Sequence, residues 1–482
     1  MRDASEMDPS DIHPVRRQQL GAWYTPEPLV AAVVAAVLPT GREPGSIVRV
    51  LDPACGDGRF LAEAAKQLAD RGIAAQLTGV DIDPHTVRTT RKRFGDTATI
   101  VCADALTRKW GKARFDLVIG NPPFLSQMSA VTSRGGKSTF GGGAYADAAA
   151  EFLALATELA RPDGGRVGLV LPLSLIATRD AGPIRANVLE QASLDWFWWS
   201  PRSVFDAQVR TCAIGLIRPA GSPSPIRRVV GSAFEPQVDL ASTVLVAERP
   251  WSMLISDQLG VPHLPLLVTA SVLSDLANVT ADFRDQYYGL VGAVGDEMDG
   301  PPLVTSGLID PGKCWWGERP IKFAKVSYQA PRVDLGRLTP RLQVWAARRL
   351  VPKVIVASQT KVIEAVVDAE GAWLPGVPVV SVIPTDPADV WKIAAVLTSP
   401  VASAWLAAKM AGSGMSAAAI RVPAATLSLL PMPNGDIDVA IAALQAGDLT
   451  ACGRAVTVAY GMTGEAADEL IDWWSRRIAD RR

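Results

Sequence analysis

The first 220 residues alternate short β-rich runs with helical stretches, and this alternation constrains the fold more than any other feature of the chain. The segment 60–69 keeps its leucines on one helical face, and a second helical pattern at 147–160 ends before Arg161-Pro162. Strands joined by helical crossovers form a parallel sheet that is covered on both faces. We therefore predict an α/β, doubly wound sheet of seven strands at residues 47–51, 76–80, 98–102, 115–119, 166–171, 194–199 and 211–217.

A segment rich in proline, glycine and serine, residues 219–225, interrupts this alternation. Such a segment propagates neither a helix nor a strand, so we predict a linker there. A length of 482 residues suits two or three domains. Beyond the linker we predict a separate α+β domain, with strands at 353–357 and 377–383, helices at 388–397 and 400–411, and an amphipathic closing helix; the predicted domains are 1–220 and 221–482.

The composition excludes several functional classes. Only three histidines and five cysteines are present, and none has the spacing of a zinc site. We therefore expect no metal and no histidine-based nucleophilic catalysis. The longest apolar run near the N-terminus, residues 29–38, is half the ~20 residues that cross a bilayer. We expect a cytoplasmic protein without a membrane segment.

A glycine-rich string, Leu-Asp-Pro-Ala-Cys-Gly-Asp-Gly-Arg-Phe at 51–60, links the first predicted strand to the first helix. Its glycines lie where the backbone turns sharply and lets a ligand approach. The spacing is not GxGxxG, and the carboxylates of Asp52 and Asp57 would repel a pyrophosphate. They suit a positively charged ligand such as S-adenosylmethionine, although a purely structural turn also fits the string.

Two further acids follow the second and third predicted strands. Asp81 lies in Gly-Val-Asp-Ile, where its carboxylate can accept hydrogen bonds from both ribose hydroxyls of an adenosyl group. Asp104 follows the third strand and can accept from the adenine amino group. Each acid also fits a turn or a helix cap without any ligand.

The most informative string is Asn121-Pro122-Pro123-Phe124, which follows a buried strand. Two successive prolines hold the carbonyl groups of this turn rigidly away from a strand ladder. The Asn121 side-chain oxygen and the Pro122 carbonyl can both accept hydrogen bonds from one planar amino group. Such acceptors favour the tetrahedral nitrogen whose lone pair attacks, while Phe124 stacks on the ring that carries the amino group.

Together these strings resemble the S-adenosylmethionine-dependent amino-methyltransferases, and most closely the gamma-class adenine-N6 DNA methyltransferases of the TaqI type. The segment 21–26 resembles the family segment that contacts the methionine end of the cofactor. The segment 203–211 resembles the stretch whose phenylalanine packs against a flipped base, here Phe205, which also suits a core position. The resemblance implies a Rossmann-like class I methyltransferase sheet and a cofactor site lined by Tyr24, Thr25, Asp52, Ala54, Cys55, Gly56, Asp81, Ile82, Asp104 and Asn121.

The resemblance also assigns catalytic residues. It implies catalysis by Asn121, Pro122 and Phe124, and stacking of the target base on Phe124 and Phe205. Phe124 stands where many DNA-modifying members carry tyrosine, so the stacking face is kept and a hydroxyl is lost. Asp52 stands where the TaqI type can carry glutamate, which is one methylene longer.

The C-terminal half resembles the target-recognition domains of the same class more faintly, and it contains a basic stretch. Residues 313–361 hold 11 lysines and arginines against two acids, a local excess of 9 positive charges in a chain whose net charge is −1. The excess fits either a solvated surface or a surface that binds the phosphates of duplex DNA. As DNA-binding residues we predict Lys322, Lys325, Arg348 and Arg349.

Two other functions fit the same strings. The Asn-Pro-Pro-aromatic turn also serves enzymes that methylate protein glutamine or ribosomal RNA, although these generally place their accessory domain before the catalytic one. A catalytically inactive DNA-binding scaffold is the third possibility. No nuclease domain is visible in the sequence, so restriction would require a separately encoded endonuclease or other defence-system proteins.

Overall fold

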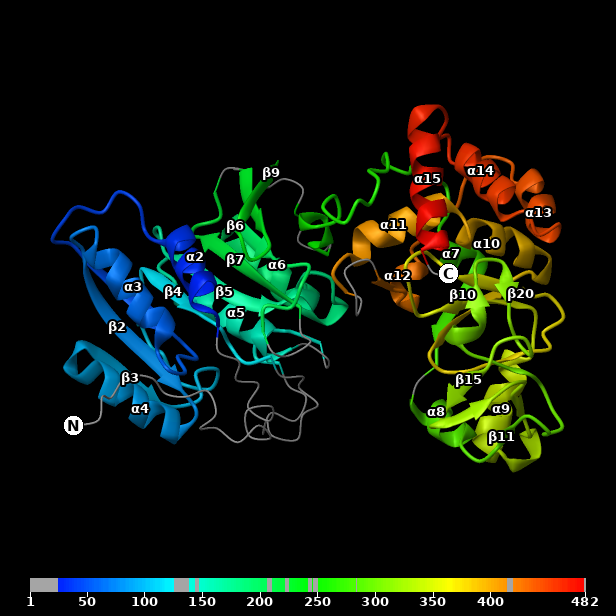
Figure 1. Ribbon diagram of the computed structural model, residues 1–482, viewed down its shortest axis with the longest axis horizontal. Coiled ribbons are helices and arrows are strands. Elements are labelled where there is room, and N and C mark those ends of the chain that lie inside the picture. The colour runs from blue at the N-terminus through cyan, green and yellow to red at the C-terminus, as the bar shows by residue number, and fades with distance from the viewer. Residues whose placement is uncertain are drawn as a thin grey trace. The chain divides into compact units, whose positions relative to one another are not determined.

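The computed structural model describes residues 25–124, 138–143, 147–205, 210–221, 225–241, 245, 250–282, 284–413 and 419–480. The chain forms two compact units, Met1–Leu254 and Ile255–Arg482 (Figure 1). The division lies after residue 254, whereas the sequence predicted it after residue 220.

A nine-stranded sheet forms the centre of the first unit, in the order β3-β2-β1-β4-β5-β7-β6-β8-β9. The seven predicted strands are all present in this sheet. Neighbouring strands are parallel in the part of the sheet from β3 through β2, β1 and β4 to β5. The strands are β1 (Ile47–Asp52), β2 (Ala74–Asp81), β3 (Ala98–Cys102), β4 (Leu117–Gly120), β5 (Arg166–Pro172), β6 (Ser193–Trp199), β7 (Thr211–Ile217), β8 (Pro225–Val230) and β9 (Glu235–Ala241).

Two predictions about this sheet were wrong. The sheet is mixed, because β7 lies antiparallel to both β5 and β6. The 11 residues between β6 and β7 are too few for the crossover helix that parallel neighbours need. The sheet also continues past the predicted linker, since β8 pairs with β6 and β9 pairs with β8. Pro225 is the first residue of β8, a position where a strand tolerates proline.

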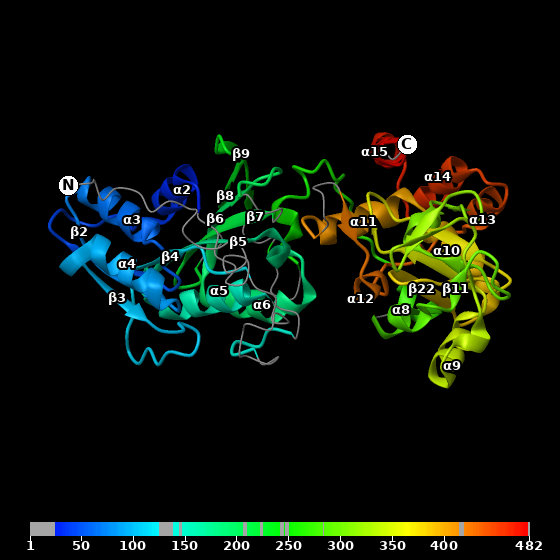
Figure 2. The ribbon, with the colours of Figure 1, turned by 60° about the horizontal axis from the view of Figure 1, so that its bottom comes forward.

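Helices cover both faces of this sheet. Buried residues of α2, α3 and α4 belong to one core cluster with β1, β2 and β4. Helices α5 and α6 pack on one another and lie across the sheet from α2 and α3 (Figure 2). The helices are α2 (Glu27–Val37), α3 (Arg59–Ala69), α4 (Pro84–Phe94), α5 (Ala148–Leu159) and α6 (Gly182–Gln191).

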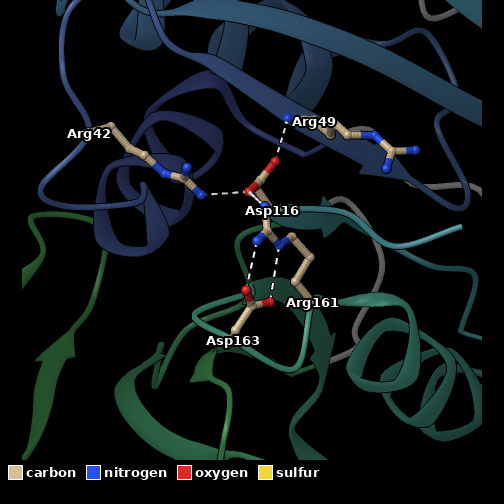
Figure 3. A network of polar contacts seen from close by, with 5 residues as sticks. All are labelled: Arg42, Arg49, Asp116, Arg161 and Asp163. Atoms are coloured by element: carbon tan, nitrogen blue, oxygen red, sulfur yellow. Dashed lines mark hydrogen bonds and ion pairs between the residues drawn. The ribbon is translucent and has the colours of Figure 1, made fainter.

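A buried aspartate organises the amino-terminal edge of this sheet (Figure 3). Arg42 and Arg161 donate to Asp116 Oδ1 over 2.6 and 3.1 Å, and the Arg49 backbone N–H donates to Asp116 Oδ2 over 2.9 Å. Arg161 also pairs with Asp163. Asp116 is 3% exposed, so these contacts compensate the burial of its charge and join the starts of β1 and β4.

The second unit contains an antiparallel sheet in the order β10-β22-β18-β20, covered by a helical cluster. Its main core joins this sheet to α10, α11, α13, α14 and α15, which confirms the α+β composition expected from the sequence. The elements of this part are α7 (Leu273–Leu276), β10 (Ala277–Ala281), β18 (Lys353–Ala357), β19 (Gln359–Thr360), β20 (Ala365–Asp368), β21 (Leu374–Pro375), β22 (Val379–Pro384), α10 (Val390–Leu397), α11 (Pro400–Met410), β23 (Ile420–Arg421), α12 (Ala424–Leu427), α13 (Asp438–Gln445), α14 (Leu449–Ala459) and α15 (Glu465–Ala479).

Residues 284–350, which we call the small lobe, form another hydrophobic core within the second unit. Its elements α8, α9, β11 and β15 lie together in Figure 1. The lobe consists of short paired strands between two helices: α8 (Arg284–Leu290), β11 (Val294–Gly295), β12 (Leu303–Val304), β13 (Ile309–Asp310), β14 (Lys313–Cys314), β15 (Ile321–Phe323), β16 (Val326–Tyr328), β17 (Arg332–Val333) and α9 (Pro340–Arg349).

Among the described residues, no single helix has the length and apolar composition that a membrane crossing requires. One pair of helices, Pro387–Leu397 and Pro400–Met410, meets these criteria when taken together, with a bend of 67° between them.

Candidate active site

The carboxyl-terminal edge of the first sheet collects the polar residues of three neighbouring strands. β1 lies between β2 and β4, and both pairings are parallel. Parallel strands end at the same edge, so Asp52 of β1, Asp81 of β2 and Asn121 after β4 all lie there. The structure thus brings together residues that are up to 69 positions apart, between 52 and 121.

The glycine turn after β1 is held by these two acids. Asp52 Oδ1 accepts from the Ala54 N–H over 3.0 Å, and Asp81 Oδ2 accepts from the Gly56 N–H over 2.9 Å. Gly58 has φ +80°, and a Cβ there would lie 2.4 Å from the ring of Phe94. The turn therefore needs glycine at position 58 for both conformation and space.

Neither Asp52 nor Asp81 has a cation beside it among the described residues. Burial raises the pKa of Asp52 well above its usual range, and the nearby charges of Asp81 and Asp57 raise it further. Burial likewise raises the pKa of Asp81, although the N–H groups of Asp83 and Gly56 partly oppose this rise. A buried and a half-buried carboxylate without a cation of the described chain beside them form a site that favours a positively charged ligand.

The catalytic turn predicted from the sequence lies directly against Asp52. A Cβ at Gly120 would lie 2.5 Å from Asp52 Oδ1, and Gly120 has φ +153°. Glycine at this position therefore lets the backbone that precedes Asn121 pass close to the Asp52 carboxylate. Pro122 is buried, and Phe124 is half-buried.

The two aromatic residues predicted to stack on a base lie beside one another. The rings of Phe124 and Phe205 meet edge to face, with centroids 6.3 Å apart and an angle of 83° between the planes. Phe124 follows β4 and Phe205 lies between β6 and β7, so the fold brings them together from distant segments. Both pack at the border of the first unit's core.

The other predicted cofactor residues differ in which of their groups a ligand can reach. Ile82 is 61% exposed beside Asp81, so its side chain is free to contact a flat ring. Cys55 is buried, which leaves only its backbone for a ligand. Asp104 Oδ1 accepts from the Leu106 N–H over 3.0 Å, the turn-capping role that the sequence also allowed.

One residue of this site, Arg59, was not predicted from the sequence. Its guanidinium pairs with Asp57 in the glycine turn and also donates to the Thr25 carbonyl. Arg59 therefore fastens the segment before α2 to the turn after β1. Thr25 is 2% exposed, and Tyr24 lies outside the described residues. Arg59 directly follows Gly58 and begins α3. This position beside the glycine turn was the signal in the sequence that could have identified it.

The basic stretch of the second unit is largely paired with acids. Arg349 makes two hydrogen bonds to Asp282, at 2.8 and 3.1 Å, and its side chain is only 14% exposed, so it does not suit a phosphate contact. Lys353 is fully buried against Asp368. Lys322, Lys325 and Arg348 are exposed, and no carboxylate of the described chain forms an ion pair with them.

No group of three or more histidine, cysteine, aspartate or glutamate side chains with the arrangement of a metal site is found in the described part of the chain.

Known proteins resemble part of the first unit in sequence. Residues 10–218 match the N-6 DNA methylase family. The type II methyltransferase M.TthHB8I of Thermus thermophilus is 38% identical over 108 residues, which are 22% of each chain. The type II methyltransferase M.XamI of Xanthomonas campestris pv. amaranthicola is 32% identical over 116 residues, 23% of this chain and 20% of that one. The matches thus span about a fifth of each relative's length.

Among solved structures, the type IIL restriction-modification enzyme MmeI, determined in complex with DNA, has a similar fold. The TM-score is 0.55 at 12% identity, and the match covers 97% of this chain and 76% of that one. The predicted fold class is confirmed: an α/β unit with a large sheet is followed by a C-terminal α+β unit, and this architecture is shared with that enzyme. The segment that matches the N-6 DNA methylase family, residues 10–218, lies within the first unit and spans less than half of the chain.

Proposed function

We propose that this protein transfers a methyl group from S-adenosylmethionine to N6 of an adenine that is rotated out of duplex DNA. The observation that carries the proposal is the Asn121-Pro122-Pro123-Phe124 turn, which lies against Asp52 at the carboxyl edge of a methyltransferase sheet. The match of residues 10–218 to the N-6 DNA methylase family supports the same chemistry. The gamma-class, TaqI-type assignment is part of this proposal.

The chemistry of the edge residues fits the cofactor. Asp52 is buried and Asp81 is half-buried, and no cation of the described residues lies beside them, which suits a ligand with ammonium and sulfonium groups. Asp81 would hold the ribose hydroxyls, and the exposed Ile82 would cover one face of the adenine ring. Tyr24 and Thr25 would contact the methionine end. When bound, S-adenosylmethionine supplies an electrophilic methyl group on its sulfonium.

The catalytic turn acts on the amino group of the target base. The Asn121 side-chain oxygen and the Pro122 carbonyl accept hydrogen bonds from the two N–H groups of that amine. These bonds favour a tetrahedral nitrogen, whose lone pair is then directed at the methyl carbon rather than into the ring. As the bond from nitrogen to the methyl carbon forms, the bond from that carbon to the cofactor's sulfur would break, and the sulfur would leave as a neutral thioether. The nitrogen would become cationic and then lose a proton to water.

The aromatic pair holds the base. An extruded base loses its stacking within the duplex, and an aromatic face restores part of that stacking energy. Phe124 and Phe205 lie edge to face, so one ring can stack on the base while the other contacts the edge of that ring. This arrangement supports the assignment of both residues to base binding.

The second unit supplies the DNA-binding surface in this proposal. The catalytic edge is acidic and cannot attract a polyanion by itself, so cations elsewhere must contact the phosphates. Lys322, Lys325 and Arg348 are exposed and have no acidic partner in the described chain, whereas Arg349 is committed to Asp282. Lys322, Lys325 and Arg348 are therefore the proposed DNA contacts, and Arg349 is not.

The relatives indicate the biological setting. Two of them are named type II methyltransferases, so we place the protein in restriction-modification or a related defence system in the cytoplasm. An endonuclease or other defence protein encoded separately would then act with it.

The test is methylation of duplex DNA with labelled cofactor, read as N6-methyladenine by mass spectrometry. Asn121→Ala should abolish methylation while cofactor binding, measured by calorimetry, persists. Asn187→Ala is the matched control, because Asn187 is exposed on α6 and, among the described residues, its side-chain oxygen accepts a hydrogen bond from the neighbouring Gln191 of the same helix. Near-normal methylation by Asn121→Ala would refute the mechanism. Methylated glutamine in protein or methylated ribosomal RNA would refute the assignment of DNA as the substrate. If the wild type did not bind the cofactor, the assignment as a methyltransferase would be refuted.

A further inference from the structure

The β15–β16 hairpin of the small lobe has a turn of unfavourable conformation. Its strands are antiparallel with Lys322 opposite Ser327 and Phe323 opposite Val326, so two residues connect them. These residues, Ala324 and Lys325, have φ +48° and +70°. Two-residue turns with positive φ at both positions usually contain asparagine and glycine, because a Cβ raises the energy of this conformation.

Contacts at the base of the hairpin hold this turn in place. The Ala324 N–H donates to the Tyr287 hydroxyl over 3.1 Å, and the rings of Tyr287 and Phe323 have centroids 4.9 Å apart. Ile321 and Phe323 are buried in the core of the small lobe. One face of the hairpin is thus fixed to α8, and the conformation of the turn is imposed by this anchoring.

The other face and the tip are exposed and cationic. Lys322 and Ser327 form a cross-strand pair that points away from the buried face, and Lys325 lies at the tip. Val326 beside it is 51% exposed. In the described chain neither lysine pairs with an acid, whereas Arg319, Arg337 and Arg349 of the same basic stretch all do.

We propose that the β15–β16 hairpin enters the major groove of duplex DNA, with Lys325 at the base edges and Lys322 on the phosphate backbone. The inference rests on the proposed function, which makes DNA the substrate. A two-stranded ribbon fits the width of the major groove, and lysine is a donor that reads acceptors on base edges there. Val326 adds an apolar group of the kind that contacts a thymine methyl.

The strained turn supports a role for Lys325 that stability alone does not explain. A glycine or asparagine at position 325 would fit the left-handed conformation better than lysine does. Strain of this kind persists at positions where the side chain serves a ligand. Lys325 occupies such a position in the two-residue turn of the hairpin, where it is exposed.

The experiment compares two substitutions that relieve the same strain. Lys325→Gly removes the charge, whereas Ala324→Gly keeps it and is the matched control. The recognition site of the wild type is first identified by single-molecule sequencing of DNA from a methylation-free host that expresses the full chain. Both variants should be at least as stable to heat as the wild type. Lys325→Gly should bind the site about tenfold more weakly and methylate mismatched sites relatively more, while Ala324→Gly should behave as the wild type.

Lys322→Gln separates the two roles of the hairpin. Loss of one phosphate contact should lower the slope of log affinity against log salt by roughly 0.9 without changing the preferred site. If Lys325→Gly binds and discriminates sites as Ala324→Gly does, the groove assignment is overturned. If the wild type methylates no DNA, the proposed function fails first, and this inference fails with it.

Discussion

The two edges of the sheet in the first unit use aspartate in opposite ways. At the amino-terminal edge, Asp116 accepts from Arg42 and Arg161, so its buried charge is balanced within the protein. At the carboxyl-terminal edge, Asp52 and Asp81 accept from backbone N–H groups, and no cation of the described chain balances them. A buried acid with its own cation stabilises the fold, whereas one without a cation is prepared for a cationic ligand at some cost to stability.

Replacement of Asp81 should produce the largest effect, and this effect should be on ligand binding. Asp81→Ala removes hydrogen bonds to ribose, each worth ~1.5–3 kcal/mol when the acceptor is charged. The affinity for S-adenosylmethionine, measured by calorimetry, should therefore fall at least tenfold. Asp81→Asn should lose less, because an amide oxygen still accepts from Gly56. Unchanged affinity in Asp81→Ala would remove the ribose assignment.

Replacement of Asp116 should lower stability and leave cofactor affinity unchanged. Asp116→Ala leaves the Arg49 N–H without its acceptor and removes two ion pairs, but Arg42 and Arg161 are about a third exposed and regain water. We expect a loss of about 2 kcal/mol in the opening free energy of β1 and β4, measured by hydrogen exchange, with cofactor affinity unchanged. Weaker cofactor binding with intact β1 and β4 would show that the two edges are not independent.

A pH titration tests the unbalanced acids directly. Burial raises the pKa of both Asp52 and Asp81 in the free protein, and a cationic ligand binds their ionised forms. The affinity for S-adenosylmethionine should therefore be constant at high pH. Below the raised pKa it should fall, by up to about tenfold per pH unit for each proton that the two acids take up. The free energy of unfolding of the free protein should depend on pH in the opposite direction to the affinity, so it should decrease as the pH rises.

The folded state holds these protons more tightly than the unfolded state does. Their stabilising contribution is therefore full below the ordinary carboxyl pKa and is lost as the pH rises through the raised value. An affinity that does not change with pH would contradict the role given to these acids.

Sequence reasoning succeeded where the controlling contacts are local. The strands of the first sheet follow from their apolar runs, and the glycine turn follows from residues two or three positions apart, such as Asp52 and Ala54. Strands β8 and β9 were missed because the proline-, glycine- and serine-rich segment 219–225 was interpreted as a linker between domains. Arg228 is nevertheless buried, since it donates to the carbonyls of Val238 and Leu254, which local patterns do not reveal.

The basic stretch shows the same limit for charge. Counting charges along 313–361 predicted a strongly positive surface, yet Arg349 pairs with Asp282, 67 residues away. Only the fold decides which cations keep their charge available, and here these include Lys322, Lys325 and Arg348. The contact between Phe124 and Phe205 joins distant segments, and local patterns did not predict it: the turn indicated Phe124, whereas only the family resemblance indicated Phe205.

The smallest effect should come from removing one arginine at the amino-terminal edge. Arg42→Gln takes away an ion pair whose cation is 33% exposed, while Asp116 keeps Arg161 and the Arg49 N–H. Because solvent screens such a pair, we expect a loss of less than about 1 kcal/mol in the opening free energy of β1 and β4. Cofactor affinity should not change, since the substitution is at the opposite end of the strands from Asp52. A loss as large as that of Asp116→Ala would mean that Arg42 alone balances the buried charge, and that this edge depends on a single pair rather than on a shared network.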